Sequence, residues 1–173
     1  VMFKAKSMEN VDGIVSVVIP CFKVKNKVLD VLAQIGPEVD IIFVVDDRCP
    51  ENTGNHVISN ILYKRVNVIF HDSNFGVGGA TITGYRQALA NNAKFIFKLD
   101  GDGQMNPSLI PNFVDTMKRT GADYVKGNRF GKIEYAKSMP KIRLMGNIAL
   151  SFFAKASSGF WNVFDPNNGY TVI

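Results

Sequence analysis

The chain has 173 residues, of which 46% are hydrophobic and 20% are charged. This length fits one domain with a sizeable core, and the composition excludes a disordered protein. The formal net charge of +5 favours an anionic partner, such as a nucleotide phosphate, a lipid phosphate or an acidic membrane face. Nucleic acid is not expected as a partner, because no basic stretch is interleaved with aromatic residues.

Apolar runs alternate along the chain with segments of helical spacing. The apolar runs predict strands at residues 15–19, 41–45, 66–70, 95–99 and 122–126. The helical spacing predicts helices at residues 27–35, 55–62, 81–90 and 106–119. Continuously apolar strands that alternate with helices indicate an α/β fold, with a mostly parallel central sheet and helices on both faces.

Ligands of such sheets bind at the carboxyl ends of the strands. The informative residues of this chain follow the ends of four predicted strands, so one shared edge is expected to carry the site. They are Pro20, Cys21 and Phe22, then Asp46 and Asp47, then residues 71–79, and finally residues 100–104. The two cysteines, Cys21 and Cys49, do not have the spacing of metal ligands, and both are expected to be reduced.

Two carboxylates follow the fourth predicted strand, with a glycine after each. Asp100 and Asp102 stand two residues apart, so in an extended chain their side chains point the same way. Gly101 lets the backbone turn and lets a ligand approach closely. The pair predicts a site for Mg²⁺ or Mn²⁺ that grips a diphosphate, with Gln104 as a further oxygen ligand. The alternative is a polar Asp-Gly turn without a metal.

Two further segments are candidates for nucleotide binding. Asp46 and Asp47 close the second predicted strand, where an acid commonly accepts a hydrogen bond from a ribose hydroxyl or a base N–H. Their alternative role is to cap a turn. Gly78 and Gly79 precede a predicted helix whose N-terminus favours anions, and their alternative role is to allow close packing.

Beyond the fifth predicted strand the pattern loosens and becomes basic. Arg129 is a candidate for clamping a phosphate through its planar guanidinium group. Asp165 is a candidate general base, or alternatively a turn residue before Pro166. We predict a single catalytic domain over residues 1–173, with residues 130–173 as an acceptor-side segment near a membrane. We also expect the chain to be a truncated piece of a longer protein.

Taken together, the motifs resemble family 2 inverting glycosyltransferases of the GT-A fold, and among them the polyprenyl-phosphate and dolichol-phosphate sugar synthases. The resemblance covers residues 15–170. It is carried by V-S-V-V-I-P, I-I-F-V-V-D-D, N-F-G-V-G-G-A-T-I-T-G-Y, K-L-D-G-D-G-Q-M-N-P, K-G-N-R-F and D-P-N-N-G-Y. The order and spacing of these motifs make the match specific.

The resemblance implies an enzyme that moves a sugar from a nucleotide-diphosphate sugar to a polyprenyl phosphate, at the cytoplasmic face of a membrane. It implies that Pro20, Phe22 and Asp46 or Asp47 hold the nucleoside, and that the metal lies on Asp100, Asp102 and Gln104. It also implies that Arg129 and Arg143 meet the lipid phosphate and that Asp165 lies near the reaction centre.

The sequence departs from the family pattern after the first strand, where Lys23-Val24-Lys25 replaces the usual Asn-Glu. Three alternatives to the implied function stay open. The acceptor could be a sugar hydroxyl in cell-surface polysaccharide synthesis. The acids could instead belong to a receiver-like signalling domain that is phosphorylated on Asp100. The chain could also bind nucleotide without turnover.

Overall fold

The computed structural model describes residues 13–61, 63–127, 150, 152–153, 156–157, 159 and 169–173. The chain divides into two compact units, one of Val1–Val125 with Val172–Ile173 and the other of Lys126–Thr171. All the site geometry given below lies in the first unit. The single catalytic domain expected from the sequence stays a prediction.

Among the described residues, six strands form one sheet in the order β3-β2-β1-β4-β6-β5. Four strands are parallel, with β2 paired to β3 and β1 paired to both β2 and β4: β1 (Ile14–Cys21), β2 (Ile41–Asp46), β3 (Val66–Phe70) and β4 (Ala93–Lys98). The short strands are β5 (Val125–Lys126) and β6 (Thr171–Val172). Ile96 and Ile173 exchange both backbone hydrogen bonds, which is the pattern of an antiparallel pair.

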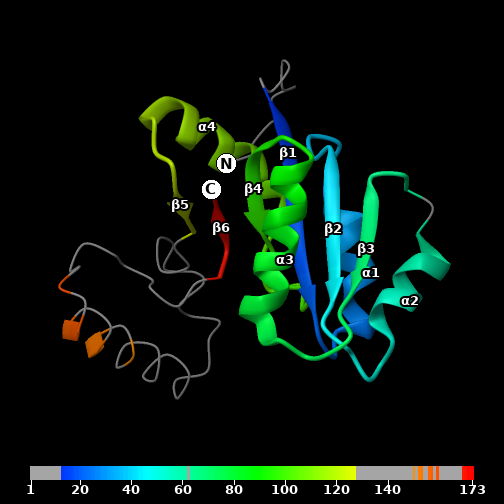
Figure 1. The fold of residues 1–173 in the computed structure, drawn as a ribbon. Coiled ribbons are helices and arrows are strands. Elements are labelled where there is room, and N and C mark those ends of the chain that lie inside the picture. The colour runs from blue at the N-terminus through cyan, green and yellow to red at the C-terminus, as the bar shows by residue number, and fades with distance from the viewer. Residues whose placement is uncertain are drawn as a thin grey trace. The chain divides into compact units, whose positions relative to one another are not determined.

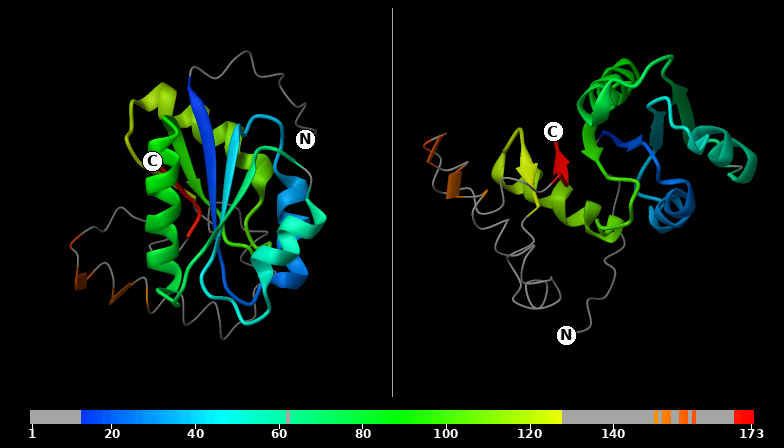
Figure 2. Two further views of the ribbon diagram at one scale, coloured as in Figure 1. Left: turned by 45° about the vertical axis from the view of Figure 1, so that its right-hand side comes forward. Right: turned by 90° about the horizontal axis from the view of Figure 1, so that it is seen from below.

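Helices lie on both faces of this sheet (Figures 1 and 2). The helix α3 (Gly76–Ala90) covers one face, while α1 (Lys25–Gln34) and α4 (Ile110–Thr120) lie on the other. The helix α2 (Thr53–Asn60) lies beside β3, and the short 3-10 helix η1 (Pro107–Leu109) leads into α4. The central strands are buried on both faces, as their continuous apolar sequences predicted. The predicted fold class is therefore confirmed.

The main difference from the predicted elements concerns α3. This helix begins at Gly76, five residues before the predicted start at residue 81, so the glycine-rich segment forms its first turns. Close packing explains a glycine further along, since a Cβ on Gly84 would overlap the side chain of Val18 in β1. No helix in the described residues is long and apolar enough to cross a bilayer.

Candidate active site at the carboxyl edge of the sheet

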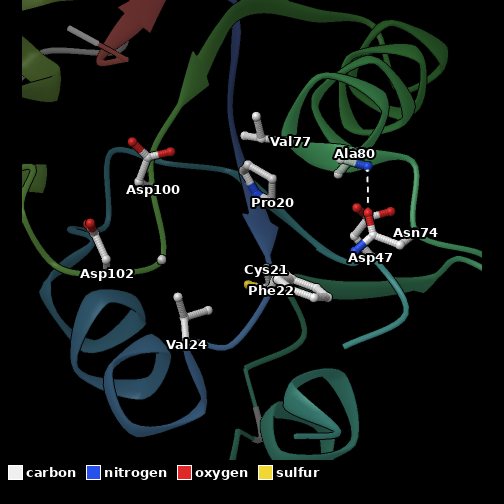
Figure 3. Close-up of a pocket in the computed structure, with 12 residues that line it drawn as sticks. Pro20, Cys21, Phe22, Val24, Asp47, Asn74, Val77, Ala80, Asp100 and Asp102 are labelled. Atoms are coloured by element: carbon white, nitrogen blue, oxygen red, sulfur yellow. Dashed lines mark hydrogen bonds between the residues drawn. The ribbon is translucent and has the colours of Figure 1, made fainter. Parts of the chain in front are cut away.

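A cavity of about 380 Å³ opens at the carboxyl ends of β1, β2 and β4, the edge at which the sequence predicted a ligand. Figure 3 shows residues from four segments around it. The wall is formed by Pro20, Cys21, Phe22, Val24, Asp47, Asn74, Gly76, Val77, Ala80, Asp100, Gly101 and Asp102. The two expected metal-binding carboxylates and one of the expected nucleoside-binding acids therefore line the same cavity.

Asp47 lies on the side of the cavity formed by the loops that follow β2 and β3. Its Oδ1 accepts a hydrogen bond of 2.9 Å from the backbone amide of Phe75. The same oxygen lies 2.7 Å from Nδ1 of His71. No described residue donates to the second oxygen, Oδ2. The carboxylate is thus fixed at one oxygen and keeps the other for a ligand.

Asp46 has a different surrounding, although it is the neighbour of Asp47. Its side chain is buried, and its two oxygens accept backbone amides from Cys49 at 2.7 Å and from Gly54 at 2.6 Å. The second of these amides lies in the first turn of α2, so Asp46 accepts hydrogen bonds from this helix and from the loop that leads into it. Asp46 does not line the cavity, and the structure brings only Asp47 to it.

Asp100 and Asp102 lie across the cavity from Asp47, on the loop that follows β4 (Figure 3). Oδ1 of Asp100 forms an ion pair with Nζ of Lys98, and Oδ1 of Asp102 accepts the backbone amide of Gln104 at 3.0 Å. Each carboxylate keeps one oxygen without a partner among the described residues. Two carboxylate oxygens suit a Mg²⁺ or Mn²⁺ ion that takes its other ligands from a diphosphate and water.

The described residues contain no group of three His, Cys, Asp or Glu side chains that converge as metal ligands. Asp100 and Asp102 are the predicted metal ligands that line the cavity. Gln104 is exposed and does not line the cavity, so its predicted role as a ligand stays a prediction. The loop itself is closed by a weak contact, in which the amide of Asp100 donates to the thioether of Met105 at 3.4 Å.

The predicted phosphate-binding glycines lie in the first turns of α3. The cavity reaches Gly76 of this helix, which has a φ of +74°, but not Gly78 or Gly79. A Cβ on Gly78 would meet no atom within 4 Å, whereas a Cβ on Gly79 would lie 2.5 Å from Cβ of Phe75. Close packing therefore accounts for Gly79.

The two cysteines lie close to the site and differ in their surroundings. Cys21 lines the cavity, and burial raises the pKa of its thiol. Burial also acts to raise the pKa of the Cys49 thiol, but hydrogen bonds outweigh it and the pKa is lowered. The donors to Cys49 include the Thr53 hydroxyl, 3.1 Å from the sulfur, and the backbone amide of Lys23, also at 3.1 Å.

Three predicted site residues, Arg129, Arg143 and Asp165, lie outside the described residues. Other residues at the site carried no predicted role in binding. Asn74, Val24 and Val77 line the cavity, and Lys98 pairs with one of its carboxylates. His71, which the sequence analysis included only in the range 71–79 at this edge, lies within hydrogen-bond distance of Asp47. The signal that pointed to Asp100, a polar residue at the end of a parallel strand, applies equally to His71.

The sequence of this chain is similar to those of known glycosyltransferases. The model of the family "Glycosyl transferase family 2" matches residues 16–173. A UDP-N-acetylglucosamine–dolichyl-phosphate N-acetylglucosaminyltransferase of Methanococcus voltae is 29% identical over 91% of this chain. An undecaprenyl-phosphate mannosyltransferase of Micrococcus luteus is 30% identical over 80% of it. The chain spans 68% of the first relative and 56% of the second.

Solved structures of glycosyltransferases share the fold of this chain. Glucosyl-3-phosphoglycerate synthase from Mycobacterium tuberculosis, crystallised with Mn²⁺, UDP and glucosyl-3-phosphoglycerate, superposes with a TM-score of 0.67. The sequences are 19% identical, and the match covers 93% of this chain and 56% of the synthase. At this identity the likeness shows the shared architecture, and the chain spans little more than half of that protein.

Proposed function

The chain belongs to glycosyl transferase family 2 and has the GT-A fold that its motifs predicted. We propose that its cavity binds a nucleotide-diphosphate sugar and that the sugar is transferred to a polyprenyl phosphate. The observation that carries the proposal is that Asp47, Asp100 and Asp102 line one cavity at the carboxyl edge of a parallel sheet. This arrangement offers a hydrogen-bond acceptor to a nucleoside at one side and two carboxylates to a metal–diphosphate at the other.

The nucleoside is assigned to the side of the cavity that contains Phe22 and Asp47. Phe22 is 43% exposed although it is a large apolar residue, so its ring is available for contact with a base. Pro20 and Cys21 lie between these two residues and the β4 loop (Figure 3), and Gly101 of that loop also lines the cavity. A Cβ on Gly101 would lie 3.0 Å from Val24 and 3.4 Å from the sulfur of Cys21, so the backbone packs closely there.

The metal is assigned to Asp100 and Asp102, whose unpartnered oxygens fit Mg²⁺ or Mn²⁺. Such an ion, when bound, stabilises the negative charge that grows on the leaving nucleoside diphosphate. The two carboxylates contribute the negative charge that retains the cation at this edge. Lys98, which pairs with Asp100, is also proposed to bind the diphosphate.

The acceptor is proposed to be a lipid phosphate because two relatives are named as transferases to dolichyl phosphate and undecaprenyl phosphate. A phosphate oxygen is ionised at neutral pH and attacks the sugar without strong base assistance, and direct attack inverts the anomeric centre. Arg129 and Arg143 are proposed to bind this phosphate. If the acceptor is instead a sugar hydroxyl, a carboxylate base such as Asp165 is required.

A direct test measures sugar transfer by the chain from UDP-, GDP-, CMP- and dTDP-sugars to a short polyprenyl phosphate, with and without Mn²⁺. The proposal expects a glycolipid product of inverted anomeric configuration, formed only with the divalent cation and visible by NMR. Binding of a nucleotide sugar without product favours a fragment without turnover. Phosphorylation of Asp100 by acetyl phosphate, without nucleotide binding, would overturn the proposal in favour of a receiver-like domain.

A further inference from the structure

Three side chains form a hydrogen-bonded chain at the nucleoside side of the cavity. Oγ1 of Thr83 in α3 lies 2.9 Å from Nε2 of His71, and Nδ1 of His71 lies 2.7 Å from Oδ1 of Asp47. The His71 ring also meets Phe75 edge to face, with ring centroids 5.1 Å apart and an angle of 82° between the ring planes. The orientation of the imidazole is therefore fixed by both ring nitrogens and by one ring edge.

The chemistry of these groups sets the direction of the hydrogen bonds. A carboxylate only accepts, so Nδ1 of His71 must carry the hydrogen that points to Asp47. In the neutral ring Nε2 is then the acceptor, and the Thr83 hydroxyl donates to it. Asp47 thus sets the tautomer of His71, and Thr83 supplies the hydrogen bond that the other ring nitrogen needs.

The hydrogen bonds from Thr83 through His71 to Asp47 determine which oxygen of Asp47 is available to a ligand. Oδ1 receives two hydrogens, from the His71 ring and from the Phe75 amide, which occupies both of its lone-pair directions. Only Oδ2 is left without a described donor. Beside it, Asn74 uses its own carbonyl oxygen to accept the Gly76 amide at 3.0 Å, so its NH₂ group is left to donate.

We infer that His71 is a positioning residue which, with Thr83, makes the site prefer a base whose single N–H lies between two carbonyls, namely uracil or thymine. This inference rests on the proposed function. Uracil presents N3–H to the free oxygen of Asp47 and a neighbouring carbonyl to the amide of Asn74. Guanine can place N1–H and its neighbouring carbonyl in the same way, but its 2-amino group then points to the filled oxygen of Asp47 and is left without an acceptor. Cytosine presents the lone pair of N3 toward the carboxylate.

The test compares binding of UDP, GDP and CDP, measured by calorimetry with Mn²⁺. The wild-type chain is expected to bind UDP at least about tenfold more tightly than GDP, since a donor left unpaired on burial is unfavourable by that order. His71→Phe keeps a ring beside Phe75 but removes both hydrogen bonds, and it should lose most of the preference for UDP. His71→Asn keeps a donor near Nδ1 and should restore much of it.

Two threonines in α3 form a matched pair for the same measurement. Thr83→Val removes the donor to His71 and should weaken UDP binding in the same direction as His71→Phe. Thr81→Val serves as the control, because the Thr81 hydroxyl donates to the carbonyl of Val77 in its own helix. The control should bind UDP as the wild-type chain does.

The tautomer supplies a readout that needs no ligand. The chain has two histidines, His56 and His71, so ¹⁵N NMR of the wild-type chain and of His56→Gln assigns the His71 ring. At a pH where the ring is neutral, the hydrogen is expected on Nδ1, and Thr83→Val should shift the ¹⁵N resonance of Nε2, which loses its donor. A hydrogen found on Nε2 overturns the inference.

The binding outcomes separate the inference from the proposed function. Equal affinity for UDP and GDP, or a folded His71→Phe variant with the preference of the wild type, overturns the inference and leaves the proposed function standing. Binding of none of the nucleotides overturns the proposed function and the base preference together.

Discussion

Nζ of Lys98 pairs with Oδ1 of Asp100, so one of the two carboxylates assigned to the metal already has a cation of the chain beside it. Both residues come from one extended segment and are two positions apart, which places their side chains on the same side. The ammonium group and an incoming divalent cation therefore compete for Asp100. A diphosphate relieves this competition, because its negative charge attracts both cations.

We expect Lys98→Met to bind Mn²⁺ about tenfold more tightly than the wild-type chain in the absence of nucleotide, the order of effect of one nearby like charge. The stem of methionine preserves the packing of a side chain that is only 13% exposed. Electron paramagnetic resonance of free Mn²⁺ measures the change. Lys94→Met, which removes an exposed lysine from the same strand, should leave the affinity unchanged. Weaker Mn²⁺ binding by Lys98→Met would contradict this account.

Asp102→Asn should lower the rate of sugar transfer at least about a hundredfold, the scale of losing one electrostatic stabiliser. The amide keeps the shape of the side chain and its acceptor for the Gln104 amide, so the loop should stay folded. The rate is measured with saturating donor and Mn²⁺. Asp115→Asn, at an exposed position of α4, is the control and should have wild-type activity. A near-normal rate for Asp102→Asn would remove this residue from the site.

Two glycines of α3 should respond in opposite ways to the same substitution. Gly84→Ala places a Cβ against Val18 and should lower the free energy of unfolding by about 1–3 kcal/mol through overpacking. Gly78→Ala places a Cβ in open space and should raise it by about 0.5–1 kcal/mol, since alanine loses less backbone entropy in a helix. Urea unfolding measures both changes. Equal effects of the two substitutions would show that α3 does not approach β1 as closely as described.

Cys49 should react with iodoacetamide before Cys21. The thiolate is the reactive form, and hydrogen bonds lower the pKa of Cys49 below its ordinary value of 9.0, whereas burial raises that of Cys21. The rate of alkylation at Cys49 should therefore rise through a midpoint below pH 9, as mass spectrometry can follow in a Cys21→Ser background. Thr53→Val removes one donor and should move this midpoint to higher pH. Faster labelling of Cys21 in the wild-type chain would be incompatible with this assignment.

The sequence predicted the sheet well because its central strands are apolar throughout, and that pattern depends on burial alone. It placed the start of α3 five residues late because glycine has a low helix propensity, and packing against β1 overrides that preference. It did not predict β6, since Thr171–Val172 is too short to carry a pattern of its own.

At the candidate site, too, the sequence predicted some features and not others. The sequence located the edge of the sheet, but it could not separate Asp46 from Asp47. Adjacent residues at the end of a strand point to opposite sides, and only the packing decides which side faces a ligand. In the structure Asp46 is buried against the backbone amides of Cys49 and Gly54, and Asp47 is left to the cavity. The link between His71 and Thr83 depends on how α3 packs against the sheet, and the helical pattern of residues 81–90 does not give that packing.

The acidic side chains at the two sides of the cavity are held by different numbers of hydrogen bonds. This difference suggests an order in which the parts of a nucleotide sugar bind. At the nucleoside side, Asp46 and Asp47 each accept two charge-assisted hydrogen bonds, which keep that half stiff before any ligand arrives. At the metal side, Asp100 and Asp102 each have one such contact, from Nζ of Lys98 and from the Gln104 amide, and the amide of Asp100 donates only to the thioether of Met105, a weak acceptor. We expect the base to dock first on the rigid half, and the β4 loop to adjust afterwards around the diphosphate.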